Sequence, residues 1–131
     1  MQLLKKYIEE IGEDLVLNDL NLKERQMRLP ARKHFWVGRL IEAKIKRNDL
    51  IGEKNKLKKE LVKKVIEDSP VRINQTSAEA ATEKYASVDK LNNSIREQDT
   101  IIEYLEKVEK ILSNMHWEIK NVIDMNKMEQ Y

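Results

Sequence analysis

The feature that most constrains the fold is an apolar repeat in the middle of the chain. Its residues recur at intervals that fit alternating threes and fours: Trp36, Leu40, Ala43, Leu50, Leu57 and Leu61. This spacing predicts a long amphipathic helix of the coiled-coil type, whose apolar stripe must pack against another helix. The 131 residues include only 3 Gly and 2 Pro, and 37% of them are charged. Because sheet proteins need glycine and proline at their turns, we predict an all-α fold.

The same periodicity divides the chain, taken as one helical domain over 1–131, into predicted segments. These are a short N-terminal helix over 1–17, a long basic helix over 19–67, a linker over 68–77, a third helix over 78–114 and a C-terminal helix over 115–131. The two long helices are expected to fold back antiparallel on each other. Two helices bury little apolar surface, so we also expect self-association.

Local signals set the expected helix ends. Asn18 or Asp19 can cap the long basic helix, and Pro30 marks either a kink within it, which we favour, or the first position of a new helix. After the linker, Thr76 or Ser77 can cap the third helix, because an acidic residue follows three positions later. Asn114 is the expected break before the C-terminal helix.

Positive charge is concentrated in one part of the chain. The segment 23–64 contains 15 Lys/Arg and 5 Asp/Glu, a net charge of +10, whereas the remaining residues carry 10 and 18, a net charge of −8. A surface of this kind neutralises phosphates and releases counterions, which predicts salt-sensitive binding of nucleic acid with little sequence preference. We assign this binding to ten residues: Arg39, Lys44, Lys46, Arg47, Lys54, Lys56, Lys58, Lys59, Lys63 and Lys64.

Two alternatives remain open for this segment. Its charges could form an ordinary solvated helix face, with long lysine stems lying on apolar surface. Trp36 fits stacking on unpaired bases, together with His34 and Phe35, but it equally fits packing between helices.

No enzymatic constellation is evident in the sequence. His34 and His116 are the only histidines and stand 82 residues apart, without a zinc-protease motif, a carboxylate cluster or a glycine-rich loop. The chain has no cysteine, which excludes disulfides and thiolate metal sites. The first residues carry acids every few positions and no continuous apolar run, so we expect a soluble, intracellular, non-enzymatic protein without cofactor, metal or membrane partner.

The C-terminal helix has two apolar arcs, where one would suffice to dock it on its own chain. The first arc is expected to continue the intramolecular seam: Met115, Ile119, Val122 and Ile123. The second is expected to face a neighbouring subunit: Trp117, Met125 and Met128. We therefore predict an oligomerisation helix formed by Trp117, Ile119, Val122, Ile123, Met125 and Met128.

This tail, "WEIKNVIDMNKME", resembles the closing pattern of the UvsY-type recombination mediators of T-even-like bacteriophages. That pattern is an aromatic residue, any residue, Ile-Lys, then Asp-Met, then a bulky apolar residue and Glu. Its counterparts here are Trp117, Ile119, Lys120, Asp124, Met125, Met128 and Glu129. The resemblance extends weakly over about the last 110 residues, and Trp36 stands where the family has a tryptophan.

The resemblance implies a function that composition does not supply. Such mediators bind single-stranded DNA, help to displace the single-strand-binding protein and load a RecA-like recombinase. They act as homo-oligomeric rings, seven-membered in the best-known member, in the cytoplasm of the infected bacterial host. The family's Leu-Lys-Ala-Arg motif falls near "LKKELVKK", where Lys58 or Lys59 matches the lysine but Glu60 or Leu61 stands at the arginine. The alternative is a helical scaffold or assembly protein with incidental basic charge.

Overall fold

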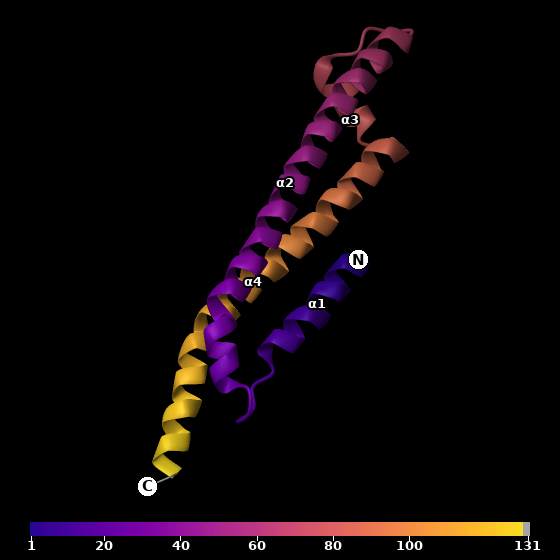
Figure 1. Ribbon diagram of the computed structural model, residues 1–131. Coiled ribbons are helices and arrows are strands. Elements are labelled where there is room, and N and C mark those ends of the chain that lie inside the picture. The colour runs from indigo at the N-terminus through magenta and orange to yellow at the C-terminus, as the bar shows by residue number, and fades with distance from the viewer. Residues whose placement is uncertain (130–131) are drawn as a thin grey trace. The chain divides into compact units, whose positions relative to one another are not determined.

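The computed structural model describes residues 1–129, and within them the only regular secondary structure is α-helical. The helices are α1 (Gln2–Leu15), α2 (Leu22–Asp68), α3 (Gln75–Thr82) and α4 (Ala86–Glu129), shown in Figure 1. The predicted all-α class, with two long helices and short ones, is therefore confirmed. Within residues 1–129, no helix is long and apolar enough to cross a membrane.

The chain folds into two compact units. The first comprises Met1–Glu42 and the chain from Ile101 onward, so that it contains α1, the first half of α2 and the second half of α4. All three helices contribute buried side chains, among them Ile11 from α1, Trp36 from α2 and Ile119 from α4. The Tyr7 and Trp36 rings meet edge to face with their centroids 5.7 Å apart. Apolar burial thus holds α1 against the pair of long helices in this unit.

The second unit is Ala43–Thr100, which contains the second half of α2, α3 and the first half of α4. Its buried residues include Val62 on α2, Ala78 and Thr82 on α3, and Val88 on α4. Leu57 and Leu61 are only half-buried. In this unit the apolar repeat is therefore only partly buried, and charged side chains form much of the surface of α2.

Several helix ends differ from the prediction. The linker is shorter than expected, because α3 begins at Gln75 and its cap is Asn74, whose side chain accepts a hydrogen bond from the Ser77 backbone N–H at 2.7 Å. The predicted cap at Thr76 or Ser77 is wrong: both lie inside α3, and the asparagine before them already provides the oxygen that the free amides need. The predicted cap of α2 at Asn18 or Asp19 is also wrong, because α2 begins at Leu22. Asn18 instead accepts from the backbone N–H groups of Leu20 and Asn21, in the turn before the helix.

The third helix does not span 78–114 in one piece. Residues 83–85 form a turn after α3, and α4 then runs without interruption through Asn114 to Glu129. The expected break at Asn114 is absent because its polar side chain is exposed, where an asparagine costs a helix little. Pro30 lies inside α2 and does not start a new helix. Whether it kinks α2 stays a prediction.

Candidate nucleic-acid interface

Half of the predicted nucleic-acid-binding residues are exposed lysines of α2 with no partner. They form no ion pair or side-chain hydrogen bond with any residue in the described part of the chain. These five are Lys46, Lys56, Lys59, Lys63 and Lys64, all in the second unit. Ammonium groups in this state keep their full charge available for phosphate.

The neighbouring arginines are engaged with acidic residues. Arg39 donates to Glu10 of α1 in the first unit, and Arg47 donates to Asp99 of α4 in the second. Arg39 also stacks over Phe35, 4.2 Å from the ring centroid. These two arginines therefore pair helices of the protein itself and are less available to phosphate. Lys44 is exposed on α2.

Lys54 and Lys58 converge on one carboxylate, that of Glu83 in the turn between α3 and α4. The Lys58 Nζ donates to Glu83 Oε1 at 2.5 Å, and the Lys54 Nζ lies 4.0 Å from the same oxygen. The hydrogen bond from Lys58 holds the pKa of the Glu83 carboxyl below its ordinary value, and the charges of Lys58 and Lys54 act in the same direction. The residue that matches the lysine of the family motif is therefore paired if it is Lys58 and free if it is Lys59.

A groove of about 340 Å³ opens between α2 and α3 beside these lysines. Its lining residues are Asn55, Lys58, Lys59, Val62, Gln75 and Glu79. The volume lies at the lower end of the range for small-molecule sites, and the lining combines two amides, two ammonium groups, the carboxylate of Glu79 and the apolar side chain of Val62. Such a lining suits a polar group better than an apolar one.

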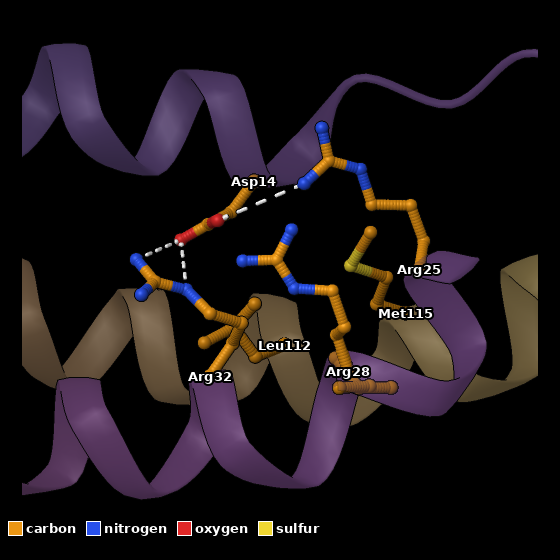
Figure 2. A pocket seen from close by; sticks show the side chains of 7 residues that line it. Asp14, Arg25, Arg28, Arg32, Leu112 and Met115 are labelled. Carbon is orange, nitrogen blue, oxygen red and sulfur yellow. Dashed lines mark hydrogen bonds and ion pairs between the residues drawn. The ribbon is translucent and has the colours of Figure 1, made fainter. Parts of the chain in front are cut away.

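In the first unit, the sequence analysis missed an arginine cluster centred on Asp14 of α1. One oxygen of Asp14, Oδ2, accepts from Arg32 Nε at 3.0 Å, from Arg32 Nη2 at 2.7 Å and from Trp36 Nε1 at 2.9 Å. Arg25 Nη1 lies 3.9 Å from Oδ1. Figure 2 shows the side chains of Arg25, Arg28 and Arg32 reaching from α2 toward this carboxylate.

This cluster closes a cavity of about 10 Å³, which is lined in addition by Leu29, Leu112 and Met115. That space holds one water at most, so it is no ligand site. Asp14 is only 8% exposed and its charge is compensated by arginines from the facing helix. The arrangement is therefore an ion-paired joint between α1 and α2. The spacing of Arg25, Arg28 and Arg32 along one helix face was the signal that could have revealed it.

The structure decides the role of Trp36. Its side chain is 2% exposed, lies against Tyr7 and donates to Asp14. It therefore packs between helices, and the alternative that it stacks on bases is wrong for this conformation. The guanidinium groups of Arg32 and Arg39 both lie over the Phe35 ring, at 4.3 and 4.2 Å from its centroid, so this ring is already engaged within the chain.

The two arcs of the C-terminal segment have different environments on α4. In the first arc, Met115 and Ile119 are buried within the first unit, while Val122 and Ile123 are half-buried. Ile119 is fully covered by its own chain, so it supports the seam and does not reach a second subunit in this conformation.

The second arc is open to solvent. Its side chains are 59%, 60% and 76% exposed, for Trp117, Met125 and Met128 respectively. Lys120 Nζ lies 5.2 Å from the Trp117 ring centroid, and the His116 ring meets the indole edge to face with the centroids 5.4 Å apart. The described residues nevertheless leave more than half of each side chain of this apolar arc exposed.

Comparison of the chain with protein-family profiles, with curated proteins and with solved structures found no match.

Proposed function

We propose that this protein is a single-stranded DNA-binding recombination mediator. The observation that carries the proposal is the set of exposed lysines on the second half of α2, in a segment with a net charge of +10. Five of these lysines have no carboxylate partner among residues 1–129, so each can bind a DNA phosphate and release the counterion held there. Salt-sensitive binding with little sequence preference is the behaviour such a surface favours.

The proposed mechanism is positional rather than catalytic. Each subunit makes a few weak lysine contacts with the strand. A homo-oligomer, which by the resemblance is a ring of seven subunits, combines these contacts along one strand. The exposed arc formed by Trp117, Met125 and Met128 supports such an assembly, because large apolar side chains at a surface favour burial against a partner. The strand is then held ready for a protein partner.

The identity of the protein partners rests on the resemblance of the tail. By that resemblance, the mediator helps to displace single-strand-binding protein and loads a RecA-like recombinase, in the cytoplasm of a phage-infected bacterium. The net charge of −8 outside the basic segment supports contacts with basic partner surfaces.

A titration of the full chain into fluorescent oligo(dT), followed by anisotropy at several salt concentrations, tests the binding step. We expect micromolar or tighter affinity, with log affinity falling steeply as log salt rises. Binding that is absent, or independent of salt, would refute the proposal.

The second candidate is a helical scaffold or assembly protein with incidental basic charge. It is favoured by the pairing of four of the ten predicted binding residues within the chain: Arg39, Arg47, Lys54 and Lys58. Both candidates predict an oligomer, so its mass does not separate them. A preference for single over double strands does, because a scaffold has no reason to prefer either.

A further inference from the structure

The Glu83 carboxylate lies among three donors in the second unit. Besides Lys54 and Lys58 of α2, the Asn92 Nδ2 of α4 donates to Glu83 Oε2 at 3.4 Å. Both lysine side chains are 24% exposed, whereas that of Glu83 is 44% exposed. The two lysine side chains are thus more buried than the side chain of Glu83, which lies on the turn between α3 and α4.

Two ammonium groups and an amide around one anion are also the donors that hold a DNA phosphate. A backbone phosphate diester carries one negative charge, as the carboxylate of Glu83 does. Replacing one by the other would leave the net charge of the site unchanged. Because the Glu83 side chain is already 44% exposed, it can turn into solvent without uncovering a buried group.

We propose that Lys54, Lys58 and Asn92 form a site for a backbone phosphate, and that Glu83 occupies this site in the free protein. A strand must then displace Glu83 before it can contact these two lysines. This inference rests on the proposed function, and it adds a built-in competitor to the binding surface. The low pKa of the Glu83 carboxyl agrees with an anion that the lysines already hold.

The surroundings provide room for the incoming strand. Lys58 also lines the groove between α2 and α3, whose volume is about 340 Å³, and the unpaired Lys59 lies along the same groove. A phosphate that replaced Glu83 at Lys58 would therefore have open space and a second ammonium group next to it. Because the strand phosphate must first displace Glu83, each phosphate contact gains less free energy than it would at an empty site. Weaker contacts suit a mediator that must release the strand.

The test compares two variants that remove one negative charge each from the second unit. Glu83→Gln removes the competitor. Glu97→Gln is the matched control, because Glu97 is exposed on α4, not on the lysine-rich helix α2, and makes no ion pair with any residue of the described chain. Both are titrated by anisotropy against the same oligo(dT) at one salt concentration, and circular dichroism confirms their helicity.

We expect Glu83→Gln to bind about two- to fivefold more tightly per site than the wild type, the range that corresponds to loss of an exposed ion pair. Glu97→Gln should show a clearly smaller gain. If the wild type binds but Glu83→Gln gains no more than Glu97→Gln, or binds more weakly, the inference is wrong and the proposed function stands. If neither the wild type nor Glu83→Gln binds at low salt, both are wrong.

Discussion

Replacing Asp14 by alanine probes the joint between α1 and α2. The substitution leaves the Trp36 indole N–H without its acceptor in a position that is 2% exposed, and it leaves Arg32 without the carboxylate oxygen that accepts two of its hydrogen bonds. Breaking a buried ion pair costs about 3–5 kcal/mol, and an unsatisfied buried donor costs about 1–3 kcal/mol within that sum. Arg32 is 26% exposed and can turn toward water, so we expect the low end, about 3 kcal/mol.

Against a total stability of about 5–15 kcal/mol, this is a large loss. It corresponds to a fall in Tm of roughly 10 °C for a chain of this size. Differential scanning calorimetry of the full chain measures it. Asp14→Asn should lose less than Asp14→Ala, because its amide oxygen can still accept from Trp36.

The matched control is Glu13→Ala, which removes the same charge from the neighbouring position of α1. Glu13 is exposed and has no ion pair with any residue in 1–129, so its loss should change stability by no more than about 0.5 kcal/mol. If Asp14→Ala melts at the same temperature as Glu13→Ala, the cluster does not hold α1 in place and the reasoning fails.

Three further results are expected. A triple substitution of free lysines to glutamine, at Lys56, Lys59 and Lys63, should weaken binding to oligo(dT) and reduce the slope of log affinity against log salt by about 2, with the Tm unchanged. The same change at the exposed Lys5, Lys90 and Lys110 should alter neither the affinity nor the slope. A triple alanine substitution of the open arc, at Trp117, Met125 and Met128, should lower the mass measured by light scattering while helicity is kept, and an unchanged mass would contradict its role in assembly. Because the pKa of the Glu83 carboxyl is lowered in the folded state, its contribution to stability is present above the ordinary value of 4.5 and is lost as the pH falls through the folded value. The wild type should therefore be slightly harder to unfold in urea than Glu83→Gln at pH 7, and this difference should shrink as the pH is lowered below 4.5.

Periodicity was sufficient to predict the long helices. Trp36, Leu40 and Ala43 are buried as the repeat requires, because a seam of this spacing can bury its residues only against another helix. The helix ends were less predictable, since Asn74 rather than Thr76 caps α3 and the chain passes through Asn114 without a break. Capping depends on which of several polar side chains lies within hydrogen-bond distance of the free amides, and the local backbone geometry determines this.

The site was harder to predict than the fold. A count of charges identified the basic segment, but it could not tell the free Lys59 from Lys58, which is held by Glu83 25 positions away. Likewise, nothing near Asp14 in the sequence indicates that Arg32 and Trp36 donate to it, because the pairing depends on how α1 lies against α2. Long-range pairing decides which charges remain available, and the sequence pattern does not contain it.

The central claim is that the exposed lysines of α2 bind single strands through phosphate contacts. The most direct measurement is the affinity of the full chain for oligo(dT) and for a duplex of equal length, by anisotropy across a series of salt concentrations. We predict micromolar or tighter binding to the single strand, with a steep negative salt slope and weaker binding to the duplex. Equal affinity for both, or affinity that does not respond to salt, would contradict the account.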